Sequence, residues 1–188
     1  MIINGAMFSR IHKIIIIFLF FAFSFIALGA GLAGAKGEAV EEPKVTNVNS
    51  YELFWPLVAG KTKGESLYSL KLFKEKARGA LIFGAFKKVD YEVFLATKRV
   101  IEAEKLLNSG KQDLANESLN LAAVHLENAQ KKMEDMGNEY KVKAKVDEVN
   151  NKLNNLETFL SWLTPQYEVS SDEIKEVLVR VQDLNQKI

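Results

Sequence analysis

Cysteine is absent from this chain of 188 residues. Its absence excludes disulfides, zinc–thiolate sites, a cysteine nucleophile and the lipid-modified cysteine of a lipoprotein. Histidine is scarce, with only His12 and His125, and neither sign of charge dominates, since the formal net charge is +1. Such a balance gives no electrostatic reason to expect nucleic acid as a partner. Stability must therefore come from the packing of apolar side chains.

The first 35 residues have the pattern of a targeting segment. Arg10 and Lys13 precede an uncharged run from residue 14 to 35, which ends in the A-x-A-like cleavage site Ala33-Gly34-Ala35. We interpret residues 1–35 as a secretory signal peptide. The alternative is an uncleaved membrane anchor, because the run is long enough to span a bilayer; direct membrane contact is then expected only through residues 14–35. Either interpretation predicts an exported, extracytoplasmic chain.

A polar segment and an aromatic segment follow. Residues 36–50 show no helical or strand period and are interpreted as a flexible linker. Residues 51–64 are interpreted as an aromatic arm, in which Pro56 prevents a regular helix from continuing. We expect the aromatic side chains to dock on the folded domain, because large apolar side chains are mostly buried. The alternative is a partner contact through Tyr51, Phe54 and Trp55.

Apolar side chains recur at spacings of three and four between residues 65 and 188, which predicts a single all-α domain. Residues 90–137 are predicted to form a helical hairpin with a tight turn at Asn108-Ser109-Gly110. Small and large side chains alternate along both of its helices, so large residues on one could pack over alanines on the other. The two stripes are Val93, Ala96, Val100, Ala103 and Leu107, and then Ala115, Leu119, Ala122, Leu126, Ala129, Met133 and Met136.

Three further helices are predicted around the hairpin. One runs from about Glu65 to Gly84, a second ends before Pro165, and the third begins at Ser170, where Glu173 completes a capping-box pattern. Matched lengths and short turns predict an antiparallel up-and-down bundle of about five helices. The alternative is that the helices on either side of residue 137 fuse into a coiled coil that pairs between chains, which leaves self-association open. In the helix after Glu65, the predicted apolar face consists of Leu67, Leu70, Phe73, Ala77 and either Ala80 or Leu81, with Lys71, Lys74, Glu75 and Arg78 on the solvent face.

Groups able to perform catalysis are few. His125 adjoins Leu126 of the predicted core stripe, and Ala122 stands where a di-iron helix would need the glutamate of its Glu-x-x-His pair. The sequence also lacks the Gly-x-Ser-x-Gly turn of a serine hydrolase. We therefore predict no catalytic residue, no metal ligand and no cofactor.

Two short motifs carry a family resemblance. The first is Gly64-Glu65-Ser66-Leu67-Tyr68-Ser69-Leu70-Lys71, followed by Lys74-Glu75-Lys76-Ala77-Arg78, and the second is Thr97-Lys98-Arg99-Val100-Ile101-Glu102-Ala103. With them, the chain from about Tyr51 to Met136 resembles the bacterial domain of unknown function 5667 family. The resemblance implies an exported or membrane-tethered helical domain and implies no catalytic residue.

We expect this chain to be a non-enzymatic exported helical module that binds or scaffolds another component of the cell envelope, either a protein or a polymer. The alternative is an extracytoplasmic sensor or regulatory domain that an uncleaved N-terminal helix holds at the membrane.

Overall fold

The computed structural model describes residues 48–136 and 143–188. All regular structure within these two ranges is helical, which confirms the predicted all-α fold. The three-residue turns at Thr164–Gln166 and Glu168–Ser170 are 3₁₀-helices that precede the last α-helix. The α-helices are α2 (Ser50–Phe54), α3 (Tyr68–Ala80), α4 (Ala85–Asn108), α5 (Gln112–Asp135), α6 (Lys143–Leu163) and α7 (Ser171–Lys187).

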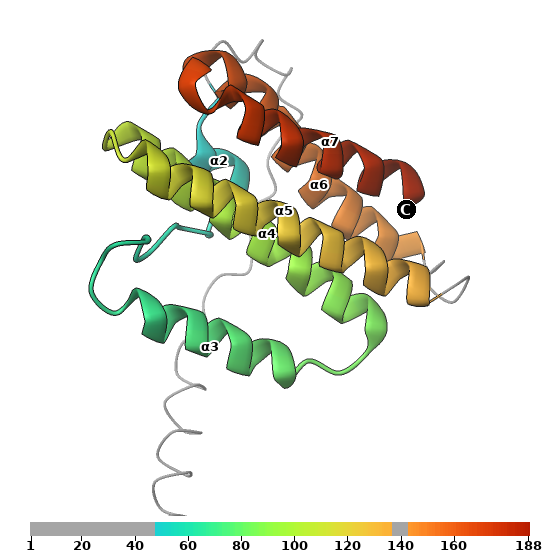
Figure 1. Ribbon diagram of the computed structural model, residues 1–188. Coiled ribbons are helices and arrows are strands. Elements are labelled where there is room, and N and C mark those ends of the chain that lie inside the picture. The colour runs from blue at the N-terminus through green and yellow to red at the C-terminus, as the bar shows by residue number, and fades with distance from the viewer. Residues whose placement is uncertain (1–47, 137–142) are drawn as a thin grey trace, which may run out of the picture. The chain divides into compact units, whose positions relative to one another are not determined.

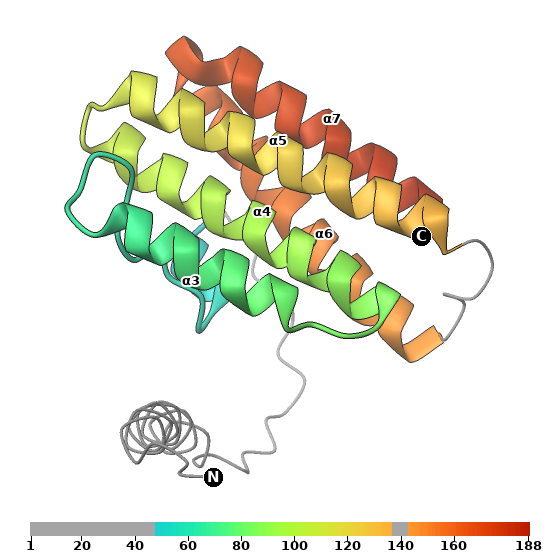
Figure 2. The same ribbon diagram turned by 60° about the horizontal axis from the view of Figure 1, so that its bottom comes forward.

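Helices α4, α5, α7 and α6 form a four-helix bundle. Helix α4 packs on α5, α5 on α7, α7 on α6 and α6 on α4, so the four helices close a ring around one core (Figure 1). Successive helices run in opposite directions, as predicted for an up-and-down bundle (Figure 2). Because α5 and α6 occupy opposite corners of the ring, the hairpin depends on both α6 and α7 to cover its apolar side.

The α4–α5 hairpin has the predicted turn. Gly110 adopts a left-handed φ of 69°, and the backbone N–H groups of Gly110 and Lys111 donate to the carbonyl oxygens of Leu107 and Leu106 at 2.9 Å. Such a turn satisfies carbonyl groups that the end of α4 leaves open. The predicted small and large side chains of both helices are buried, apart from Met136, which packs against the core while partly exposed.

Helices α6 and α7 complete the core with branched side chains. Those that are almost fully buried are Val149, Leu153, Leu156, Leu160 and Leu163 of α6 and Ile174, Val177, Val181 and Leu184 of α7.

The start of α7 departs from the predicted capping box. Ser170 is the N-cap residue, but within the described residues its hydroxyl has no hydrogen-bond partner. Glu173 accepts a hydrogen bond of 2.8 Å from the side-chain amide of Asn116 on α5. The packing of α7 on α5 offers this carboxylate a partner across the interface, so it does not fold back on its own helix.

Several predictions fall on residues whose structure is not described. These are the targeting segment 1–35, most of the linker 36–50, and the possible fusion of two helices across residue 137. Helix α5 ends at Asp135 and α6 begins at Lys143, so the region of the proposed fusion is not covered. In the described ranges, no helix is both long and apolar enough to cross a membrane.

Helix α3 lies outside the ring, beside α4 (Figure 2). Its two faces agree with the sequence pattern, but the prediction of which face meets the protein was wrong. Leu70 and Phe73 are exposed, whereas Tyr68 and Glu75 are buried. The reversal has a physical cause, because the side of α4 that meets α3 carries Arg99 and other charged groups that need charged partners.

Candidate functional site

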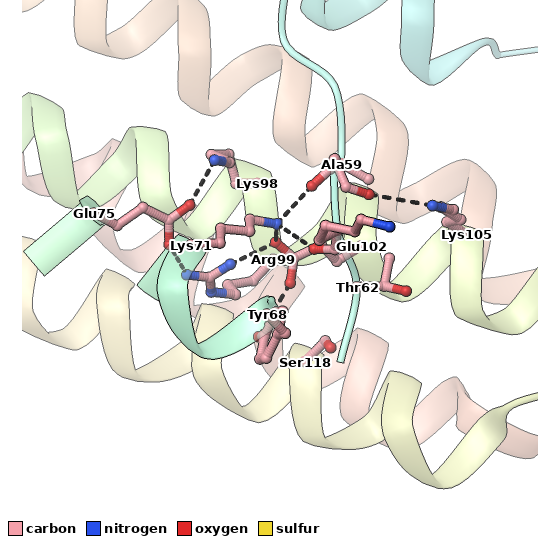
Figure 3. Close-up of polar contacts among 12 residues, drawn as sticks. Ala59, Thr62, Tyr68, Lys71, Glu75, Lys98, Arg99, Glu102, Lys105 and Ser118 are labelled. Atoms are coloured by element: carbon pink, nitrogen blue, oxygen red, sulfur yellow. Dashed lines mark hydrogen bonds and ion pairs between the residues drawn. The ribbon is translucent and has the colours of Figure 1, made fainter. Parts of the chain in front are cut away.

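Five charged residues meet between α3 and α4, and we call them the ion cluster. Lys71 and Glu75 come from α3, and Lys98, Arg99 and Glu102 come from α4. Their charges alternate along the series Lys98, Glu75, Arg99, Glu102 and Lys71, so each carboxylate lies between two cations (Figure 3).

Arg99 is the centre of the ion cluster. One terminal nitrogen of its guanidinium donates to the carboxylate of Glu75, and the other donates to that of Glu102. The Arg99 side chain is 2% exposed and the Glu102 side chain 0%, so these charges are almost entirely removed from water. Arginine suits this position because its planar fork carries several donors in a fixed geometry. The cluster thereby joins α3 to α4 through a cation shared by two carboxylates.

Lys71 ties a loop to the ion cluster. Its ammonium donates to the carbonyl oxygens of Ala59 at 2.6 Å and Lys61 at 2.7 Å, and also to the carboxylate of Glu102. An ammonium group has three N–H donors, so all of them are used. The segment before α3 is therefore fixed to α3 and α4 by one side chain.

Two tyrosines complete the buried polar layer. The Tyr68 hydroxyl donates to Glu102 Oε2 at 3.3 Å, and burial together with the negative charge of Glu102 raises the pKa of Tyr68 to about 12. The Tyr91 hydroxyl donates to the backbone carbonyl of Glu75 at 2.8 Å. Gly79 allows this approach, since a Cβ there would lie 3.1 Å from the Tyr91 ring. Tyrosine rings thus fill space on both sides of the ion pairs.

Opposing effects act on the pKa of Glu75. Burial raises it, while the hydrogen bond from Lys98, at 2.5 Å, and the charge of Arg99 lower it. The attraction of the two cations is the larger effect, so the pKa of Glu75 lies below its ordinary value. The carboxylate is therefore charged at neutral pH despite its burial.

The chain before α3 sets the orientation of that helix. The Glu65 carboxylate accepts hydrogen bonds from the Thr62 hydroxyl at 2.6 Å and the Thr62 backbone N–H at 3.2 Å. These bonds lower the pKa of Glu65 to about 2. Leu67 then precedes the helix with a left-handed φ of 69°, which is uncommon for a leucine. From this turn, α3 starts with Tyr68 facing inward and Leu67 facing outward.

The opposite side of α3 is apolar and exposed, and we call it the outer face. Its most exposed helical side chain is Phe73, at 68%, and two residues just past the helix, Leu81 and Phe83, are exposed still further. Val124 of α5 and Val179 of α7 are single exposed apolar side chains, which are normal for a folded protein. The large side chains of the outer face are Leu67, Leu70, Phe73, Leu81 and Phe83.

A cleft of about 480 Å³ separates the polar side of α3 from the α4–α5 hairpin. Where the cleft borders α5, the carboxylate of Glu92 on α4 pairs with two α5 side chains. It lies 3.1 Å from the ammonium nitrogen of Lys132 and 2.8 Å from Nδ1 of His125. Burial raises the pKa of Glu92, but these two partners outweigh it and lower the pKa below its ordinary value. His125 is thus paired with a carboxylate at the edge of the cleft. The lining residues are Leu72, Glu75, Lys76, Gly79, Lys88, Tyr91, Glu92, Leu95, Arg99, His125, Asn128 and Lys132.

The three residues predicted as a partner contact are divided by the structure. Phe54 is buried and meets the Phe159 ring edge-on, with the centroids 5.5 Å apart. Tyr51 and Trp55 are exposed, and their rings meet edge to face with the ring centroids 4.8 Å apart. Part of the arm is helical, since Ser50–Phe54 forms α2. The helix ends before Pro56, as predicted from the presence of that proline. Of these three residues, Tyr51 and Trp55 are accessible to a partner and Phe54 is not.

No group of three or more histidine, aspartate and glutamate side chains in the described part of the chain could hold a metal ion.

Comparison with known proteins gives one match. A family model described as a domain of unknown function, DUF5667, matches residues 60–183. The chain belongs to the DUF5667 family. The match extends beyond the predicted 51–136, since it includes α6 and most of α7, and it begins after Tyr51, Phe54 and Trp55. No curated protein and no solved structure matches the chain.

The ion cluster was missed as a site, although the sequence held a signal for it. The two motifs that carry the DUF5667 resemblance contain Tyr68, Lys71 and Glu75 in one and Lys98, Arg99 and Glu102 in the other. The structure brings the two motifs together. A mid-helix arginine followed three residues later by a glutamate, both outside the apolar stripe of α4, could have suggested a second packing surface.

Proposed function

We propose that this DUF5667 chain is a non-enzymatic binding module of the cell envelope that contacts its partner through the outer face of α3. The proposal is carried by one observation, the exposure of five large apolar side chains on one helix and at its two ends, with Leu70 and Phe73 in α3 itself and Leu67, Leu81 and Phe83 flanking it. Such a patch on a folded domain is typical of an interaction site. A structural role alone would favour burial of these side chains.

The ion cluster supports the proposal because it fixes which way α3 faces. A half-turn rotation of α3 would bury Leu70 and Phe73. The same rotation would move Lys71 and Glu75 into solvent and leave the buried groups of α4 without their partners. Removing one partner of a buried ion pair is strongly destabilising, by about 3–5 kcal/mol. The ion cluster therefore keeps the outer face in solvent, although burial of Leu70 and Phe73 would by itself be favourable.

Site-specific photocrosslinking tests the proposal in cells that make the protein. A photoreactive amino acid replaces Phe73 on the outer face, and the matched control replaces Val179, an exposed apolar residue of α7. We expect a crosslink to another envelope component from position 73 and none from position 179. Equal or absent crosslinking at the two positions would remove α3 as the binding element.

The placement in the envelope has its own test. Mass spectrometry of the N-terminus of the native protein should find a start at Lys36 if residues 1–35 are a cleaved signal peptide. An intact N-terminus would instead favour the alternative function, a sensor or regulatory domain held at the membrane by residues 14–35. The outer face of α3 would be the binding surface in both cases.

A further inference from the structure

The exposed charges of α3 and of the first turn of α4 have one sign. Between Ser66 and Val89 the sequence has six basic residues and a single acidic one, Glu75. The structure turns Glu75 inward, where Lys98 and Arg99 neutralise it. The exposed charged side chains of this stretch are all cations, namely Lys74, Lys76 and Arg78 of α3 and Lys87 and Lys88 in the first turn of α4.

The cations flank the apolar side chains of α3. At 3.6 residues per turn, Leu70, Phe73 and Ala77 lie on one side of the helix, with Lys74 and Lys76 on its two flanks. A helix with leucine and phenylalanine on one face and lysines beside them is typical of helices that lie in a membrane interface. With 13 residues, α3 is too short to span a bilayer, so its contact would be with one surface.

We propose that the outer face of α3 lies on an anionic membrane surface, with its apolar side chains between the lipid headgroups and its lysines against lipid phosphates. This inference rests on the proposed function, since it names the partner of the same face. If residues 14–35 remain as an uncleaved anchor, this would be a second membrane contact of the same chain.

Charge complementarity favours lipid over a second copy of this chain. A symmetric dimer through the outer face would bring the Lys74 and Lys76 flanks of two molecules together, and like charges in close contact oppose association. An anionic bilayer instead offers negative charge along the whole face, and each lysine near such a surface strengthens binding about fivefold.

Site-specific fluorescence labelling tests this inference. Because the chain has no cysteine, an environment-sensitive fluorophore attaches only to the one cysteine that is introduced. The full chain is labelled at Phe73→Cys or, as the matched control, at Val179→Cys. It is then reconstituted into vesicles of phosphatidylcholine alone or of phosphatidylcholine with phosphatidylglycerol. Residues 14–35 are available to enter both kinds of vesicle, so the fluorophore reports the position of α3 rather than attachment of the chain.

We expect the emission of the position-73 fluorophore to shift to the blue and to brighten in the anionic vesicles, and we expect high salt to reverse both changes. The emission of the position-179 fluorophore should remain that of a dye in water. Replacing Lys74 and Lys76 by glutamine should weaken this association about fivefold for each lysine. These exposed substitutions leave the ion cluster and the bundle core untouched, so misfolding does not confuse the result.

Three outcomes would overturn the inference: a position-73 fluorophore that stays in water in anionic vesicles, one that is buried equally without anionic lipid, or one that becomes buried with rising protein concentration when no vesicle is present. The last outcome would identify a second copy as the occupant. A protein crosslinked at position 73 in cells, together with no burial in vesicles, would refute the membrane partner while leaving the binding role of α3 intact.

Discussion

The four-helix bundle and α3 are attached to the same helix, α4, by opposite kinds of contact. Val100 and Ala103 of α4 pack in an apolar core, whereas Arg99 and Glu102, which lie beside that apolar stripe, hold α3 through ion pairs. Apolar burial stabilises in proportion to the area removed from water. A buried ion pair adds little net stability because desolvation offsets the attraction, but it fixes geometry strongly. The bundle therefore supplies stability, and the ion cluster supplies orientation.

The largest expected effect comes from removing the central cation. Arg99→Met leaves the buried carboxylates of Glu75 and Glu102 without their shared partner, at a cost of about 3–5 kcal/mol. We expect α3 to detach while the bundle stays folded. Hydrogen exchange followed by mass spectrometry should show loss of protection over residues 68–80 with protection of α5 retained.

The matched control for that variant is Arg180→Met on α7, whose partners Glu127 and Glu176 are exposed. A surface ion pair contributes about 0–1 kcal/mol, so this change should leave both regions protected. Simultaneous loss of protection in α3 and α5 after Arg99→Met would mean that the two regions are one cooperative unit.

A core substitution should act on the whole domain. Leu156→Ala opens a cavity at a fully buried position and should lower the free energy of unfolding by about 2–5 kcal/mol. The midpoint of denaturant unfolding, followed by circular dichroism, measures the change. The control Val124→Ala, at an exposed site on α5, should stay within about 0.5 kcal/mol. Equal effects at the two positions would contradict the assigned core.

Acid should loosen α3 before the bundle. The folded state lowers the pKa of Glu75 below its ordinary 4.5, so its ion pairs contribute fully above that pH and are lost as the pH falls through the lowered value. Protection of residues 68–80 against hydrogen exchange, relative to the intrinsic rate at each pH, should therefore fall as the pH drops below 4.5, ahead of protection in α5.

Two comparisons isolate Glu75 as the source of this acid effect. Glu65, whose pKa the Thr62 hydrogen bonds hold at about 2, stays ionised through most of the range. The variant Glu75→Gln cannot ionise and should show no such pH step. A step that persisted in Glu75→Gln would point instead to Glu92, whose pKa is also lowered.

The smallest effect on stability is expected on the outer face. Phe73→Ser removes a large apolar side chain, yet 68% of that side chain is already exposed. We expect a change within about 0.5 kcal/mol in denaturant unfolding, as for other surface substitutions. A loss comparable to that of Leu156→Ala would show that Phe73 belongs to the core after all, and the binding role of α3 would fail with it.

The spacing of apolar residues in the sequence was sufficient to predict the core of the four-helix bundle. The stripe that includes Leu119, Ala122 and Leu126 is buried as predicted, because a stripe at spacings of three and four on a long helix has an interior to face when neighbouring helices carry the same pattern. The turn at Gly110 was also predictable, since glycine readily adopts the left-handed conformation found there.

The same spacing was not sufficient to predict which face of α3 packs against the bundle. The pattern correctly separated Leu70 and Phe73 from Lys71 and Glu75, but it cannot tell which face meets the rest of the protein. That choice depends on Arg99 and Glu102, which lie 24 or more residues further along the chain. Of the predicted partner contact, Tyr51 and Trp55 are exposed, whereas Phe54 is buried because it packs on Phe159.

The sequence by itself determined an all-α chain, the hairpin turn and the stripes that form the bundle core, because each depends on residues within a few turns of one another. The tertiary structure alone decided that α3 turns Lys71 and Glu75 inward and Leu70 and Phe73 outward. The physical reason is that charges buried on α4 must be neutralised, and only folding shows that Lys71 and Glu75 are the groups within reach.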